Sequence, residues 1–217
     1  GALDKHAAEV PAPPILRQKQ SSPDLSPKCD RQPSTLFSPE RHFHSFIVKG
    51  WALCCMTNRF SRVLYEEAYK FSNRRKTFGK KLFENQMIRW KLAEMVRLID
   101  STHAWIENVT YQMDTMSPIE ADYKLGGTTA LLKVHCTKVM EYCAREAAQI
   151  FGGLSYTRSG LGSKVERLNR EVRAMAIPGG SEEILIELSL KQAKKVAEFA
   201  KQLQDSRDEG MATNAKL

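Results

Sequence analysis

The residues from Arg74 to Lys80 read Arg-Arg-Lys-Thr-Phe-Gly-Lys, a composition that could bind a ligand. Arginine offers paired N–H donors that match phosphate oxygens, and glycine lets a ligand approach the backbone closely. Thr77 adds a hydroxyl group, and Gln86 follows shortly afterwards. The segment is therefore a candidate phosphate site, although a basic helix end closed by Gly79 would have the same composition.

Two later segments also combine glycine with polar residues. Residues 149–153 read Gln-Ile-Phe-Gly-Gly, and residues 177–183 read Ile-Pro-Gly-Gly-Ser-Glu-Glu. Ser181 is suited to cap a helix, with Glu182 and Glu183 in the first turn, where the helix dipole favours acidic side chains. The first segment is therefore expected to close one helix, and the second to open another.

Helices must position these segments, because apolar residues recur every three or four positions along most of the chain. Pro118 ends one such pattern, since proline cannot continue a helical hydrogen-bond ladder. Gly126 and Gly127 lie inside another, which predicts a neighbour that packs close to them. No segment alternates with period two, so we expect an all-α fold without a sheet, a four-helix up-down bundle. The expected helices span residues 51–71, 88–113, 125–147 and, after an N-cap at Ser181, 182–203.

The composition changes sharply along the chain. Seven of the nine prolines fall within the first forty residues, among Ser, Gln, Lys and Asp, a mixture that cannot form a packed core. We therefore expect residues 1–48 to be a disordered or atypical tail, residues 49–205 to form one helical domain, and residues 206–217 to form a C-terminal tail. No apolar run approaches the length of a membrane span.

The net charge of +8 suits nucleic acid, anionic lipid or a polyanionic cofactor. Because the basic residues alternate with glutamates along the helices, nucleic acid is the least favoured of these partners. The five cysteines form no CxxC pair, and His103 and His135 stand singly on their helices. We therefore expect neither a disulfide framework nor a metal site, and a reducing compartment.

In their order and spacing, the motifs resemble the acyl-CoA dehydrogenase family from about Trp51 to Leu203. The resemblance implies an FAD-dependent oxidoreductase that oxidises the Cα–Cβ bond of a fatty acyl-CoA in β-oxidation. It also implies a homo-oligomer, a dimer or tetramer, whose FAD lies between this bundle and two earlier domains that the chain lacks. The motifs are RKTFGK, a Gln followed by KLAEM, QIFGG, VERL with two later arginines, and GGSEEI.

The resemblance implies FAD contacts from three segments. The segment after the first helix would contact the FAD of a neighbouring subunit, the end of the third helix would lie near its adenosine part, and the start of the fourth would lie beside flavin phosphates. A serine replaces the family's threonine in the last segment and keeps its hydroxyl. In that order, the residues are Arg75, Thr77, Phe78 and Gln86; Gln149 and Gly153; Ser181 and Glu183.

The catalytic base is displaced or missing. Proton removal from an acyl thioester needs a carboxylate in a water-poor pocket, and most of the family places a Glu where this chain has Gly179. Some members take the base from a Glu-Arg pair that opens the first bundle helix, which makes Glu40 the candidate. The family's spacing from Arg75 leads instead to Lys49, about nine residues, or roughly 13 Å of helix, from Glu40. Either an insertion loops Glu40 back, or the family-like sequence ends near Trp51 and the preceding stretch is unrelated.

Several alternatives remain open at this point. The chain is either part of an acyl-CoA dehydrogenase, with the subgroup that carries a cytochrome b5-like domain as one option, or an acyl-CoA oxidase. A catalytically inactive helical oligomerisation module is a third reading, favoured by the missing base and domains. The electron acceptor and acyl chain length are not determined by these residues. The ending Ala215-Lys216-Leu217 differs by one residue from a peroxisomal signal, so we expect a peroxisome or, failing that, a mitochondrion.

Overall fold

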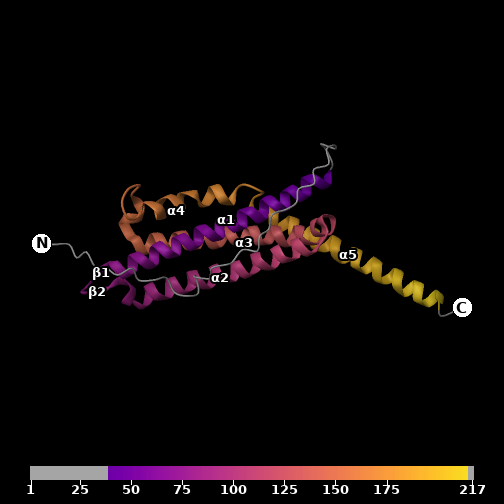
Figure 1. The fold of residues 1–217 in the computed structure, drawn as a ribbon, viewed down its shortest axis with the longest axis horizontal. Helices are drawn as coiled ribbons and strands as arrows, with labels where there is room; N and C mark the ends of the chain where they lie inside the picture. Colours follow the sequence, from indigo (N-terminus) through magenta and orange to yellow (C-terminus); the bar gives the residue numbers. More distant parts are fainter. Residues whose placement is uncertain (1–38, 215–217) are drawn as a thin grey trace.

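The computed structural model describes residues 39–214, which form a bundle of helices (Figure 1). Helix α3 lies between the others and carries more buried residues than any other helix. After α1 come a hairpin of two-residue strands and the 3-10 turn η2, which together lead into α2. The elements are α1 (Pro39–Arg74), β1 (Lys76–Thr77), β2 (Lys80–Lys81), η2 (Leu82–Glu84), α2 (Gln86–Thr115), α3 (Pro118–Phe151), η3 (Gly152–Tyr156), α4 (Ser163–Ala176) and α5 (Glu182–Asn214).

The all-α prediction and the four long predicted helices are confirmed, as α1, α2, α3 and α5. Helix α4 was not anticipated, since its buried residues Val165, Val172 and Ala176 make too short an apolar stripe to stand out in a polar segment. The prediction of no strands missed the hairpin. Its strands leave no alternating pattern because each is only two residues long and largely exposed.

Two predicted boundaries differ from the structure. Helix α1 begins at Pro39, ten residues before the expected start of the domain, and Ile47 is already buried in the bundle. Helix α5 continues to Asn214, past the expected end at residue 205. The rest of the predicted tail, residues 1–38, and the last three residues lie outside the described part of the chain. The bundle therefore extends beyond both predicted limits.

Most of the core lies where α3 packs against α1, α2 and α4. Leu64 and Ala68 of α1, Met95 and Ile99 of α2, and Met140 of α3 are fully buried there. The phenyl rings of Phe71 and Phe151 stack at the far end of this core, 4.2 Å between centroids. Burial of these side chains away from water is the main force that holds the helices together.

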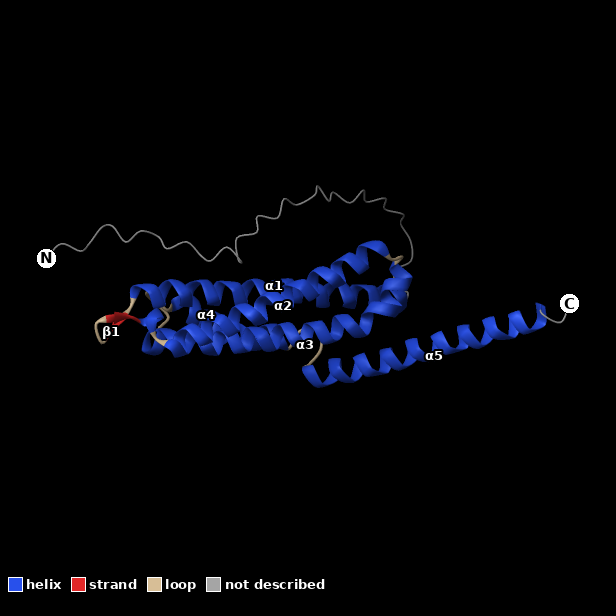
Figure 2. Ribbon diagram, turned by 90° about the horizontal axis from the view of Figure 1, so that it is seen from below, coloured by secondary structure: helices blue, strands red, loops and turns tan. Residues whose placement is uncertain are grey.

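Helix α5 packs on the first half of α3 and then extends away from the bundle (Figure 2). The predicted close neighbour of Gly127 is this helix, because a Cβ at Gly127 would lie only 3.1 Å from the Ser189 carbonyl oxygen. Further along, the Tyr123 hydroxyl donates to the Lys195 carbonyl at 2.9 Å, and its ring meets that of Phe199 edge to face. The absence of a side chain at Gly127 therefore allows α5 to approach.

Candidate functional site

The hairpin between α1 and α2 holds an aromatic ring out in solvent. Phe78 and Gly79 form its two-residue turn, with φ angles of 51° and 79°. Both lie in the left-handed region, as a tight hairpin turn of this kind requires, but a phenylalanine is strained there. The Phe78 side chain is fully exposed, so packing against the described residues of this chain does not explain its presence. Strain of this sort tends to persist at functional loops.

A cavity of about 260 Å³ opens beside the hairpin, where α1 ends against α3 and η3. The stacked rings of Phe71 and Phe151 form part of its wall. Apolar walls beside cationic side chains suit a ligand with a planar ring and an anionic group. The lining residues are Glu67, Lys70, Phe71, Arg74, Arg75, Phe151, Leu154 and Leu161.

The three cations of this cavity are available to an outside anion. Within the described part of the chain, neither Lys70, Arg74 nor Arg75 has a side-chain hydrogen bond or an ion pair. The acid at the rim, Glu67, instead pairs with Lys164 of α4 at 2.8 Å, which raises the pKa of Lys164. The cavity lining therefore carries a net positive charge, and this charge attracts phosphate.

Four further predicted cofactor contacts lie at the same end of the bundle. Thr77 is in strand β1, and Gln86 is the exposed first residue of α2. Gln149 and Gly153 are exposed on either side of Phe151, at the end of α3 and in η3. With Arg75 and Phe78, six predicted contact residues from three separate segments are thus brought to one end of the bundle.

Sequence reasoning missed the contributions of Lys70 and the two stacked rings. Lys70 and Arg74 are four residues apart on α1, so they share a helix face, and that spacing was a usable signal. Phe71 and Phe151 looked like ordinary core residues. Only the crossing of α1 and α3 shows that their stacked pair also lines the cavity.

The remaining predicted contacts, Ser181 and Glu183, lie elsewhere. They open α5, where the Glu183 backbone N–H and, to a smaller extent, a Ser181 hydrogen bond stabilise the Glu183 carboxylate and lower its pKa. Lys138 of α3 pairs with Glu182 at 2.8 Å. Lys138 precedes Gln149 by eleven residues, about 16 Å of helix, so one phosphate group cannot contact both sets.

The turn at Gly179 packs against α1, since a Cβ at Gly179 would lie 3.4 Å from Cδ1 of Leu53. Glu40 precedes Leu53 by thirteen residues in an unbroken helix, about 20 Å along its axis. The side chain of Glu40 lies outside the described residues. No loop shortens the path between Glu40 and Arg74, so the structure does not bring the Glu40 backbone near Gly179.

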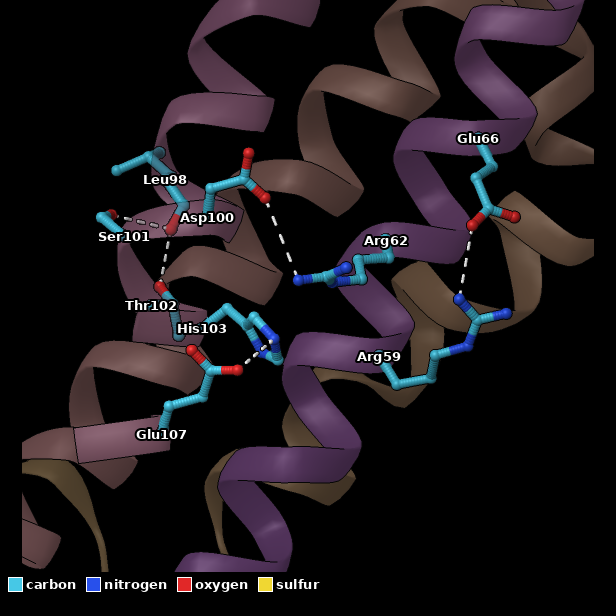
Figure 3. A network of polar contacts seen from close by, with 9 residues as sticks. All are labelled: Arg59, Arg62, Glu66, Leu98, Asp100, Ser101, Thr102, His103 and Glu107. Carbon is cyan, nitrogen blue, oxygen red and sulfur yellow. Dashed lines mark hydrogen bonds and ion pairs between the residues drawn. The ribbon is translucent and has the colours of Figure 1, made fainter. Parts of the chain in front are cut away.

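A polar network between α1 and α2 stabilises the bundle rather than forming a reactive site (Figure 3). Arg62 of α1 reaches Asp100 of α2 at 3.9 Å. His103 pairs with Glu107 on its own helix at 3.3 Å, and Thr102 meets His135 of α3 at 3.0 Å. These are pairwise contacts between or along helices.

The described residues of 39–214 contain no group of three or more His, Cys, Asp or Glu side chains arranged to hold a metal ion. No helix within this range is both long and apolar enough to cross a membrane. Cys54, Cys136 and Cys143 are buried as free thiols, and Cys55 is half-buried in the same form.

Residues 45–194 match the family described as acyl-CoA dehydrogenase, C-terminal domain. The chain belongs to the acyl-CoA dehydrogenase family. Enzymes of this family are oxidoreductases that act on CH–CH groups. The family resemblance predicted from the motifs is therefore confirmed.

Two fungal relatives show how much of a family member is present. The chain is 40% identical over 162 residues to the acyl-CoA dehydrogenase AFT10-1 of Alternaria alternata, covering 74% of this chain and 36% of that relative. It is 36% identical to the acyl-CoA dehydrogenase apdG of Emericella nidulans, covering 64% of this chain and 32% of that relative. The chain thus spans about a third of the length of the curated relatives it matches.

Solved structures agree on the fold. Butyryl-CoA dehydrogenase from Megasphaera elsdenii superimposes with a TM-score of 0.60 at 21% identity, over 68% of this chain and 36% of that one. The acyl-CoA dehydrogenase from Geobacillus kaustophilus gives 0.63 at 20% identity, over 70% and 38%. At this level of identity the likeness establishes the helical-bundle fold.

The family typically binds FAD, and the two groups of predicted contacts fit that cofactor unequally. The hairpin end fits well, since it offers unpaired cations, an exposed ring and a glycine backbone beside a cavity. The start of α5 fits less well. Its helix dipole would favour a phosphate, but Glu182 and Glu183 already place two carboxylates in the first turn.

Proposed function

We propose that this chain is the FAD-contacting helical bundle of an acyl-CoA dehydrogenase that oxidises the Cα–Cβ bond of a fatty acyl-CoA. The observation that carries the proposal is the cavity beside the hairpin, with Lys70, Arg74 and Arg75 around the stacked rings of Phe71 and Phe151. FAD supplies a hydride acceptor when bound. This chain supplies the groups that hold its phosphates and a ring.

The proposed roles follow from the side chains. Arg75 and Arg74 donate to pyrophosphate oxygens, and Lys70 adds a further positive charge. The exposed ring of Phe78 covers a planar group of the cofactor, which explains a large apolar side chain held in water. Gln149 and Gly153 flank the cavity, where an adenosine part would extend.

A homo-oligomer, a dimer or tetramer, is part of the proposal. The hairpin end and the start of α5 are too far apart to serve one phosphate group. In the arrangement that the family resemblance implies, the hairpin end contacts the FAD of a neighbouring subunit. The exposed Phe78 supports this arrangement, because none of the described residues of its own chain covers it.

Flavin titration of the purified chain tests the binding role. Calorimetry with FAD at low salt should show binding that weakens about tenfold in Arg75→Ala, the loss expected for one charge-assisted phosphate contact. Arg97→Ala is the matched control, since Arg97 is exposed on α2 and already bonded to Glu94. Equal affinities for the two variants would exclude the hairpin end as the flavin site.

The chemical step requires a base that this chain does not place at Gly179. We expect FAD bound by the chain to keep its visible absorption when palmitoyl-CoA is added, in wild type and in Glu40→Gln alike. Bleaching by wild type that Glu40→Gln abolishes would instead identify Glu40 as the base. Bound flavin without bleaching would favour an FAD-binding bundle with no turnover of its own.

The oligomerisation module is the second candidate function, and the glycine at position 179 favours it. In that case the chain assembles into dimers or tetramers and binds no flavin. Sedimentation of the chain with and without FAD separates the two candidates. A peroxisomal location would be tested by removing the Ala-Lys-Leu ending from a fluorescent fusion.

A further inference from the structure

Lys133 of α3 is a lysine buried to 1% exposure in the described part of the chain. Its ammonium donates to two backbone carbonyls, those of Ala176 at the end of α4 and of Gly180, the latter at 2.9 Å. The two carbonyls lie on opposite sides of the turn between α4 and α5. The Lys133 side chain of α3 thus bridges the two ends of this turn.

Each partner of the ammonium needs a donor. The Ala176 carbonyl is among the last four of α4, which have no partner inside their own helix. Gly180, with φ of 110°, lies against Leu185, and a Cβ there would be only 3.0 Å from Cδ2 of that leucine. Residues 177–179 of the turn are exposed, but Ala176 is buried and Gly180 is half-buried, so unpaired carbonyls at these two ends would be costly.

The charges around Lys133 support a fixed ammonium. It lies at the negative end of the α4 dipole. Burial lowers the pKa of Lys133, while the nearby Cys54 thiol and the Glu182 carboxylate oppose that shift. Glu182 is itself paired with Lys138, one turn further along α3. Helix α3 therefore contacts the turn through Lys133 and the first residue of α5 through Lys138.

We propose that Lys133 is the positioning residue of the turn 177–181, which carries Gly179, the family's usual base position, and Ser181. Its ammonium fixes the location of residue 179 against α1 and the location of the Ser181 hydroxyl. Loss of the ammonium frees the turn and the start of α5, while α1, α2 and the rest of α3 keep their packing. The link to the flavin rests on the proposed function, but the positioning role does not.

Amide hydrogen exchange tests this role without any cofactor. In Lys133→Met, which keeps the length of the side chain but not the donors, we expect exchange at Ile177 and Leu185 to rise at least tenfold. The buried amides of Met95 and Ile99 on α2 should exchange as in wild type. Lys124→Met is the matched control, because it removes only an exposed pair with Glu120 within α3 and should leave the Ile177 and Leu185 amides slow.

The outcomes separate positioning from general packing. A uniform rise over all helices, or no local rise, would overturn the proposal. If Lys133→Met does not fold, Lys133→Gln retains one donor and should show the local rise in weaker form. Nitrogen-detected spectra of wild type should also show a slowly exchanging Lys133 ammonium coupled to the Ala176 and Gly180 carbonyls. A fast-exchanging ammonium would contradict the role, whereas wild type that fails to bind FAD would count only against the proposed function.

Discussion

Cδ1 of Leu53 lies 3.4 Å from the point that a Cβ on Gly179 would occupy. The contact is an ordinary one, so α1 leaves room for a side chain at the position where most of the family has its base. The backbone imposes the restriction, since Gly179 has φ of 76°. Any other residue there would be strained.

Replacement of Gly179 should therefore cost stability through the backbone. Gly179→Ala is expected to lower the free energy of unfolding by about 1–2 kcal/mol. Gly153→Ala is the control, because Gly153 has no positive φ and nothing lies within 4 Å of its added Cβ, so its change should stay within about 0.5 kcal/mol. Urea titrations followed by circular dichroism give both values. Equal losses would show that the positive φ at position 179 imposes no penalty on a side chain.

Replacement of Phe78 should lower flavin affinity without lowering the stability of the fold. Phe78→Gly relieves the φ of 51° and removes no packed surface, so the unfolding free energy should stay the same or rise by up to about 1 kcal/mol. FAD affinity should fall. Tyr111→Gly, which removes an exposed ring near the C-terminal end of α2, should instead lose up to about 1 kcal/mol and keep FAD affinity. Reduced stability in Phe78→Gly would mean that the ring packs within its own chain.

Gly127 should tolerate no side chain, although it lies within a helix. Gly127→Ala places a Cβ 3.1 Å from the Ser189 carbonyl oxygen and 3.3 Å from Gln192 Cβ, so α5 must move. We expect a net loss of about 1–3 kcal/mol despite the better helix propensity of alanine. Gly50→Ala is the control, with Thr129 Cγ2 at 3.5 Å, and should gain about 0.5–1 kcal/mol. Opposite signs in thermal unfolding would verify the close approach of α5.

Alkaline pH should destabilise the bundle through Cys143. Burial raises the pKa of this thiol to about 12 from an ordinary 9.0, with a smaller opposing effect of a Ser61 hydrogen bond. Because the folded pKa is the higher one, the stability that the neutral thiol contributes is complete below pH 9 and is lost as pH rises toward 12.

Between pH 8 and pH 10.5, wild type should lose about 2 kcal/mol more than Cys143→Ala in urea titrations. Both proteins should decline further above pH 10, where Tyr65, with a pKa raised by burial to about 12, begins to oppose folding in the same way. Identical pH profiles for the two proteins would show that the Cys143 thiolate is hydrated in the folded state.

The sequence by itself determined the four long helices, their order and the family. Helical spacing is local, so apolar stripes along α1, α2, α3 and α5 could be found without any knowledge of neighbours. The stop at Pro118 and the start near Ser181 follow from backbone chemistry within a few residues. The motifs around Arg75 and Gln149 were recognisable for the same reason, since order along the chain is enough.

Only the tertiary structure decided which of those residues meet. The pairing of Phe71 with Phe151 depends on how α1 crosses α3, and no local pattern encodes that crossing. The separation of Ser181 from the hairpin end, and the burial of the Lys133 ammonium against two carbonyls, likewise depend on where α4 places the turn. Side-chain spacing along one helix is fixed by its own geometry, whereas contacts between helices are selected by packing of the whole core.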